Sequence, residues 1–195
     1  ASAVLMNLLK KQRDAVGLSI FSDKYEYYAP EKGSDRHHRM LLNTLEELLE
    51  NQKEKKQTDT ITHLHLIAEK MHRRSMIVLF TDMFQDGNSE QLFNALQHLK
   101  HNKHKVVVFH VIDEKTELNF NFDNTPRKFI DVESGEIINL YSENIKEEYE
   151  KRVAEYFKKL SLTCAQNKIK YVPVNVGANF EKILTTYLAE KQNFG

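Results

Sequence analysis

The sequence lacks the features that mark secreted, disulfide-rich and membrane-spanning proteins. Its 195 residues include one cysteine, three prolines, six glycines and no tryptophan. A lone Cys164 cannot form an internal disulfide, which is consistent with a reducing compartment, so we expect a cytoplasmic protein. No apolar run approaches the roughly 18 residues of a membrane helix, and no signal peptide is recognisable. We therefore expect no membrane segment in this chain.

An excess of one charge is also missing. Lys and Arg together number 28, and Asp and Glu together also number 28. This neutrality gives no electrostatic argument for nucleic acid or an anionic membrane, so we expect neither as a partner. Hydrophobic residues make up 41% and charged residues 29%, which is typical of a soluble globular protein. The length fits a single domain over residues 1–195.

The motifs of several common enzyme classes are absent. There is no P-loop, no G-x-G-x-x-G and no G-x-S-x-G, and scarce glycine makes a phosphate-binding loop hard to build. The nine histidines include no H-E-x-x-H pattern. The side chains of His63 and His65 diverge on a helix, so they cannot share an ion. The helix macrodipole alone accounts for His98, His101 and His104, which lie near the C-terminal end of a predicted helix. The spacing therefore does not indicate a zinc site.

What the sequence does contain is an alternation of strand-like and helix-like segments. Apolar, β-branched runs predict strands at 15–21, 25–28, 76–80, 105–112 and 169–174, the last at a sheet edge because of Pro173. Apolar spacings of three and four predict helices at 1–11, 36–54, 61–71, 89–99, 142–167 and 180–188. An insert at 114–141 carries a β-hairpin. This order predicts a three-layer α/β/α sandwich around a mostly parallel sheet.

Acidic residues follow three of the predicted strands. Asp23, Asp82 and Asp113 each end an apolar run, and in a parallel sheet they would share one edge. Ligands of open α/β sheets bind beyond the carboxyl ends of strands. Carboxylate and hydroxyl oxygens suit Mg²⁺, so these acids with Thr58 form a candidate metal site. The alternative is that the acids only end strands and cap the helices that follow.

Several segments together suggest a family. They are QRDAVGLSIFSD at 12–23, Thr58 to Thr60 followed by His63 and Leu64, RRSMIVLFTDMF at 73–84, VVFHVID at 107–113 and the hairpin at 131–138. The chain resembles the von Willebrand factor A-like domains of the bacterial domain-of-unknown-function family fifty-eight. Those proteins are associated with MoxR-type AAA ATPases, and their fold is Rossmann-like.

The resemblance implies a metal-ion-dependent adhesion site. In that fold the site combines a D-x-S-x-S stretch after the first strand with a threonine and an aspartate from two other loops. Thr58 matches the threonine and Asp82 the aspartate, whereas D-x-S-x-S is absent and Gln57 replaces the usual glycine. We expect the sequence to be truncated before Ala1. Mg²⁺ or Mn²⁺ would then bind in the intact parent, and this chain alone would bind metal poorly.

The missing first strand also has a structural consequence. In the resembling fold it lies between the strands expected at 15–21 and 76–80, so its loss leaves backbone groups facing a gap. Either the gap closes directly or a strand from another chain fills it, which would give a homodimer by strand exchange.

Two hypotheses for function follow. The first is a non-enzymatic protein-interaction module with an incomplete metal-ion-dependent adhesion site, linked to a MoxR-type AAA ATPase as its partner. The alternative is a small-molecule enzyme of unknown reaction on a Rossmann-like sandwich, because a fold does not fix a function. The enzyme would need a pocket with convergent polar groups.

Overall fold

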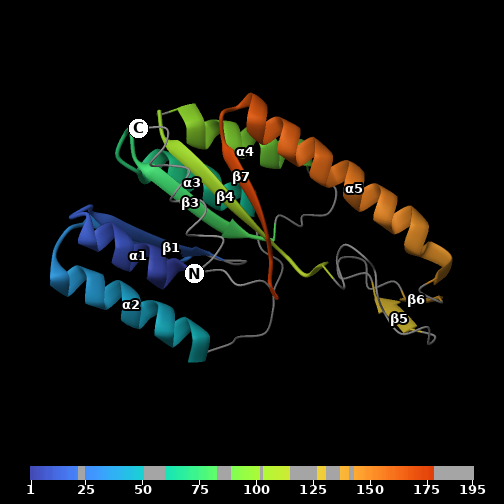
Figure 1. Ribbon diagram of the computed structural model, residues 1–195, viewed down its shortest axis with the longest axis horizontal. Helices are drawn as coiled ribbons and strands as arrows, with labels where there is room; N and C mark the ends of the chain where they lie inside the picture. The colour runs from blue at the N-terminus through green and yellow to red at the C-terminus, as the bar shows by residue number, and fades with distance from the viewer. Residues whose placement is uncertain are drawn as a thin grey trace. The chain divides into compact units, whose positions relative to one another are not determined.

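The computed structural model describes residues 1–21, 25–50, 60–82, 89–101, 103–114, 127–130, 137–140 and 143–177. Its helices and strands are labelled in Figure 1, and they fall into two units. The first unit contains α1 (Ser2–Lys11), β1 (Val16–Phe21), β2 (Tyr25–Lys32), α2 (Asp35–Glu50), α3 (Thr60–Lys70) and α4 (Ser89–His101). The second contains β3 (Met76–Thr81), β4 (Lys105–Ile112), β5 (Arg127–Ile130), β6 (Ile137–Leu140), α5 (Glu143–Gln166) and β7 (Lys170–Asn175).

In the first unit, β1 and β2 form an antiparallel pair with a register shift between Val16 and Leu18. Gly17 lies at that shift. A Cβ on Gly17 would come within 2.8 Å of the carbonyl oxygen of Ala29, so a side chain does not fit there. Glycine is therefore required where the two backbones approach closely.

Helices α1 and α2 pack with this pair around a small apolar core. Met6, Ala29 and Leu41 are buried at its centre. The ring of His37 in α2 donates a hydrogen bond from Nε2 to the carbonyl oxygen of Val16, 3.0 Å away. An ion pair of 2.9 Å between Lys10 and Asp35 further links the two helices. The amphipathic spacing in the sequence thus places one face of each helix against the strands.

The second unit is built on a parallel sheet in the order β3–β4–β7 (Figure 1). Its central strand, β4, is apolar and buried on both faces, as its continuous run predicts. Phe80 and Phe109 stack with ring centroids 5.0 Å apart. Helix α5 packs against β7 and buries Leu160 and Cys164. Separately, β5 and β6 form an antiparallel hairpin with Ile130 opposite Ile137.

Four connections from a helix to a strand contain a basic residue with positive φ, namely Arg13, Arg74, Lys103 and Lys168. The connection after α5 is one example. There the N–H of Lys168 donates to the carbonyl of Ala165 and the N–H of Ile169 donates to that of Cys164. This is the Schellman pattern, in which the left-handed residue is usually glycine. A basic side chain there interacts favourably with the negative end of the helix dipole.

The structure confirms the coarse prediction of a mixed α/β protein with a parallel sheet and helices. Four of the five strands predicted from apolar runs form within one residue of their expected bounds, and β7 lies at an edge of the described sheet as Pro173 indicated. The strand expected to end at residue 28 instead continues through Pro30 to Lys32. Edge strands tolerate proline because one side of their backbone needs no ladder bond.

Other predictions about the architecture stay untested. The described strands form three separate sheets, and the complete three-layer sandwich, the single domain over 1–195 and the missing first strand remain predictions. The helix expected at 180–188 and much of the insert at 114–141 lie outside the described residues.

The Schellman geometry predicts opposite effects for one change at two positions. Lys168→Gly should raise the free energy of unfolding by about 0.5–1 kcal/mol, because glycine adopts positive φ without a steric penalty. Lys158→Gly, at an exposed position inside α5, should lower it by about 1 kcal/mol. Urea unfolding of both variants measures the difference. Equal effects of the same sign would contradict the assignment.

Candidate functional site

Two of the three predicted acids do share one sheet edge. Asp82 directly follows β3 and is exposed, and Asp113 directly follows β4 and is partly buried. Because β3 and β4 are parallel, with Thr81 opposite His110, both acids lie at the carboxyl ends of adjacent strands. Thr58 and Asp23 lie outside the described residues. The structure therefore places one member of the predicted metal-binding pair, Asp82.

The described residues do not by themselves make a site for a hard cation. Within the described ranges, no three His, Cys, Asp or Glu side chains are grouped so that they could hold a metal ion. Mg²⁺ needs near-octahedral oxygen ligation, and Asp82 supplies only part of it. The assignment of Thr58 and Asp82 as metal ligands therefore stays a prediction.

A buried histidine lies directly beneath this edge. His110 lies in β4. Its Nε2 atom is 2.6 Å from the carbonyl oxygen of Asp82, and its Nδ1 atom is 2.5 Å from the hydroxyl oxygen of Tyr171 in β7. A carbonyl oxygen only accepts, so Nε2 carries the proton and Nδ1 accepts from the tyrosine hydroxyl. This bridge, which we call the His110 bridge, links the central strand to residues of both its neighbours.

Burial shifts the pKa values of the titratable side chains in and beside the His110 bridge in the directions that favour their neutral forms. Burial lowers the pKa of His110, and the edge of the Phe157 ring packs against it with centroids 4.7 Å apart. Burial raises the pKa of Tyr171, that of Tyr156 to about 12 and that of the Cys164 thiol to about 11. None of these groups is therefore an activated base or nucleophile near neutral pH.

Sequence reasoning missed the His110 bridge. His110 stands in an apolar run and Tyr171 in another, and neither belongs to a recognisable motif. The one available signal was a polar ring inside a strand predicted to be buried, because such a group needs a hydrogen-bond partner. Its partner depends on the pairing of β4 with β7, which places His110 opposite Pro173.

Loss of the Tyr171 hydroxyl should destabilise the protein. Tyr171→Phe leaves the buried Nδ1 of His110 without its donor, which should cost about 1–3 kcal/mol in unfolding free energy. Tyr27→Phe removes a hydroxyl from a half-buried side chain in β2 and should change stability by less than about 0.5 kcal/mol.

A double-mutant cycle with His110→Leu isolates the interaction between the two side chains. We expect the loss in the double variant to be smaller than the sum of the single losses. Urea denaturation supplies the four free energies. Strict additivity, or an equal effect of Tyr171→Phe and Tyr27→Phe, would show that the hydrogen bond contributes nothing.

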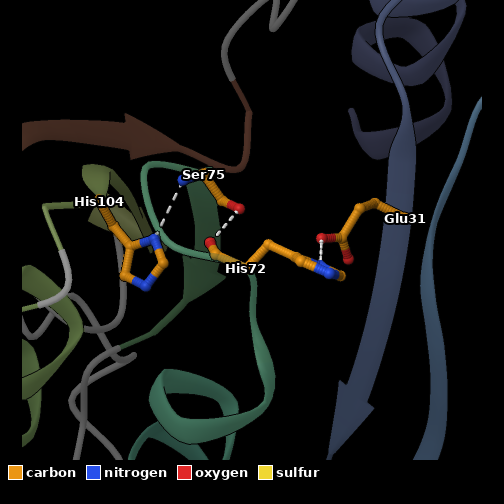
Figure 2. Close-up of polar contacts among 4 residues, drawn as sticks. All are labelled: Glu31, His72, Ser75 and His104. Carbon is orange, nitrogen blue, oxygen red and sulfur yellow. Dashed lines mark hydrogen bonds and ion pairs between the residues drawn. The ribbon is translucent and has the colours of Figure 1, made fainter.

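A second polar cluster, in the first unit, surrounds Ser75 (Figure 2). The backbone N–H of Ser75 donates to Nδ1 of His104 over 3.2 Å, and the Ser75 hydroxyl donates to the carbonyl oxygen of His72 over 2.6 Å. The ring of His72 in turn contacts the carboxylate of Glu31 in β2. The cluster thus connects β2, the loop after α3 and the residue that precedes β4.

This arrangement contains serine, histidine and glutamate but is not a nucleophile with its base. His104 bonds to the backbone of Ser75, whereas the Ser75 hydroxyl is directed to a different acceptor, the carbonyl of His72. His104 is buried, and burial lowers the pKa of its ring. A general base must instead bond to the hydroxyl that it activates. The cluster therefore has a structural role: its hydrogen bonds connect β2, the loop after α3 and the residue before β4.

The Glu31–His72 contact predicts a pH-dependent contribution to stability. Burial alone would raise the pKa of the Glu31 carboxyl, but hydrogen bonds from its backbone and from His72 outweigh burial and lower it. A carboxyl group whose pKa is lower in the folded than in the unfolded state stabilises the fold at any pH above its unfolded-state pKa, which is about 4.3. This stabilisation is lost as the pH falls through the folded-state pKa.

Glu31→Gln should therefore lower the free energy of unfolding by about 0.5 kcal/mol at neutral pH, a small effect because His72 is exposed. The difference from the unchanged chain should vanish below about pH 4. Glu69→Gln, at an exposed position on α3, is the matched control. Unfolding free energies measured from about pH 3 to pH 7 test this. A difference that grows in acid would have the wrong sign.

Comparison with known proteins assigns the family. The model of the family described as "Protein of unknown function DUF58" matches residues 1–159. The chain belongs to the DUF58 family. Membership agrees with the resemblance read from residues 12–23 and 73–84. No protein with a curated description matches the chain.

Two solved structures are similar to this DUF58 chain at low identity. An aerotolerance-related membrane protein from Bacteroides fragilis, with multiple mutations to serines, is 17% identical, with a TM-score of 0.48 over 97% of this chain and 87% of that one. An uncharacterized membrane spanning protein from Vibrio fischeri is 14% identical, with a TM-score of 0.23 over 95% and 81%. Within the described residues, no helix is long and apolar enough to cross a membrane.

Proposed function

We propose that this DUF58 chain is a non-enzymatic protein-interaction module that binds its partner at the edge of the sheet carrying Asp82. The observation that carries the proposal is an exposed carboxylate above a layer of neutral side chains. Asp82 is exposed, and its backbone carbonyl is fixed by the buried ring of His110. A rigid backbone beneath an exposed charge suits recognition, because little conformational freedom is lost on binding.

The chemistry of the His110 bridge favours this function over catalysis. Catalytic acids, bases and nucleophiles need pKa values near the working pH. Here burial moves the pKa values of His110 and of the Cys164 thiol away from neutrality, in the directions that keep each group uncharged. The enzyme alternative therefore gains no specific support from these residues.

The resemblance supplies the finer parts of the proposal. We infer a MoxR-type AAA ATPase as the partner and the cytoplasm as the location. Together with the further ligands that the resemblance implies, Thr58 and Asp82 would help to hold Mg²⁺ or Mn²⁺, and that ion would supply a positive charge for an acidic group of the partner. A second copy of the chain, exchanging a strand, is the other partner that the sequence suggests.

A pull-down with a MoxR-type AAA ATPase of the same organism tests the interaction. The chain should retain the ATPase, and Asp82→Ala should reduce retention about tenfold, as expected for loss of about 1.4 kcal/mol. Glu46→Ala removes an exposed carboxylate from α2 and should have no effect. Equal retention by both variants would exclude Asp82 from the interface. Catalytic turnover by the purified chain in a hydrolase screen would contradict a non-enzymatic role.

A calorimetric titration tests the incomplete metal site separately. With Mg²⁺ or Mn²⁺, this chain should show no saturable binding at micromolar concentrations, because the sequence lacks the D-x-S-x-S ligands that accompany Thr58 and Asp82 in the resembling site. Asp82→Ala should leave the weak heats unchanged. Micromolar binding that Asp82→Ala abolishes would show that the site is complete.

A further inference from the structure

Two histidines meet between neighbouring helices of the first unit. The Nδ1 atoms of His65 on α3 and His98 on α4 are 2.8 Å apart. The ring centroids are 5.0 Å apart, with the ring planes tilted by 42°. The difference between the two distances is close to two imidazole radii, so both nitrogens lie near the line that joins the ring centres. The N–H bond or lone pair of each Nδ1 is therefore directed at the other Nδ1 atom.

This geometry requires one proton between two nitrogens. Two unprotonated nitrogens would face each other with lone pairs, and two N–H groups would clash, so one ring donates through Nδ1–H and the other accepts. The shared hydrogen lies between two nitrogens that each have a lone pair when the hydrogen is moved elsewhere. Two imidazole nitrogens directed at one point are also the donor set that transition metals prefer.

We propose that His65 and His98 form a bis-imidazole site for a divalent late transition metal ion of the class of Zn²⁺ and Cu²⁺. The ion replaces the shared proton. The ring that carries Nδ1–H moves this proton to its own Nε2, so both Nδ1 lone pairs bind the ion and no proton is released overall. The site therefore needs neutral rings and no further reactant.

The distances are close to those of a metal complex. Metal–nitrogen bonds of about 2.0–2.1 Å at a tetrahedral ion place two ligand nitrogens roughly 3.3 Å apart. The observed 2.8 Å must therefore widen by about half an ångström, and each ring must turn by roughly 35° so that its lone pair points at an ion beside the line between the nitrogens. Both rings are only partly buried, so side-chain rotations can supply both changes without moving the helices.

The packing of α3 against α4 holds the two histidines in place. Each is adjacent in sequence to a fully buried leucine, Leu64 beside His65 and Leu99 beside His98. Because these leucines are in the apolar core, the helices keep a fixed spacing and the site is largely preformed. Ligation by two side chains leaves positions for water, so binding should be weaker than at a closed four-ligand zinc site.

The ligand chemistry separates this site from the strand-end acids. Imidazole nitrogen suits Zn²⁺, Ni²⁺ and Cu²⁺, whereas Mg²⁺ selects oxygen ligands. By the usual order of stabilities, Cu²⁺ should bind more tightly than Ni²⁺ or Zn²⁺. Failure of the proposal about Asp82 would therefore leave this inference untouched, and the converse also holds.

Calorimetric titration of the chain with Zn²⁺ and with Cu²⁺ tests the site. We expect one ion per chain at the tightest site, and about tenfold or greater loss of affinity in His65→Ala and in His98→Ala. His72→Ala is the matched control, because it removes an exposed histidine near the end of α3 and should leave this affinity unchanged. Equal affinity in the chain and in the His65→Ala/His98→Ala double variant would overturn the proposal.

Nitrogen NMR of the unmutated chain gives an answer that does not depend on how the variants fold. One equivalent of Zn²⁺ should shift the Nδ1 resonances of His65 and His98 together, and it should convert the ring that carries Nδ1–H to the Nε2–H form, which the other ring already has. Shifts confined to other histidines would identify an adventitious ion only and would overturn the assignment. Circular dichroism of each variant confirms that its helices are retained.

Discussion

The hydrogen bonds of one buried imidazole determine how the carboxyl end of the parallel sheet is built. His110 in the central strand donates to the carbonyl of Asp82 and accepts from the hydroxyl of Tyr171. Both nitrogens of this buried ring are satisfied, and the two hydrogen bonds link the residue after β3 and the tyrosine of β7 to β4. The exposed carboxylate of Asp82 owes its position to that constraint. The buried ring of His110 thus helps to position the exposed edge of the sheet at Asp82.

The same constraint shapes the function that this DUF58 chain can perform. Burial keeps the groups beneath Asp82 uncharged, so the edge presents a carboxylate on a neutral, rigid support. In the first unit, Ser75 and His104 contact each other through the serine backbone, so that pair contributes to stability and not to nucleophilic chemistry. Both polar clusters are therefore consistent with a protein that recognises a partner, which is the function proposed for it.

Much of the secondary structure could be predicted because it is encoded locally. The apolar runs of β3 and β4 predicted both strands, but only β4 is buried on both faces, whereas β3 alternates between partly buried and buried residues. Pro173 predicted that β7 lies at an edge of the described sheet. The positions of Asp82 and Asp113 followed from parallel pairing. The paired histidines could not be predicted, because His65 and His98 are 33 residues apart and meet only through the packing of α3 on α4. Sequence spacing directed attention to neighbours on one helix, which diverge.

Nitrogen NMR of the His110 ring tests the central claim most directly. The account predicts a neutral ring with its proton on Nε2 at about pH 7, and a ring that becomes charged only at a lower pH than an exposed histidine, because burial lowers its pKa. Replacement of Tyr171 by phenylalanine should shift the Nδ1 resonance, because that nitrogen loses its donor. A charged ring at about pH 7, or a neutral ring protonated at Nδ1, would contradict the bridge to Asp82.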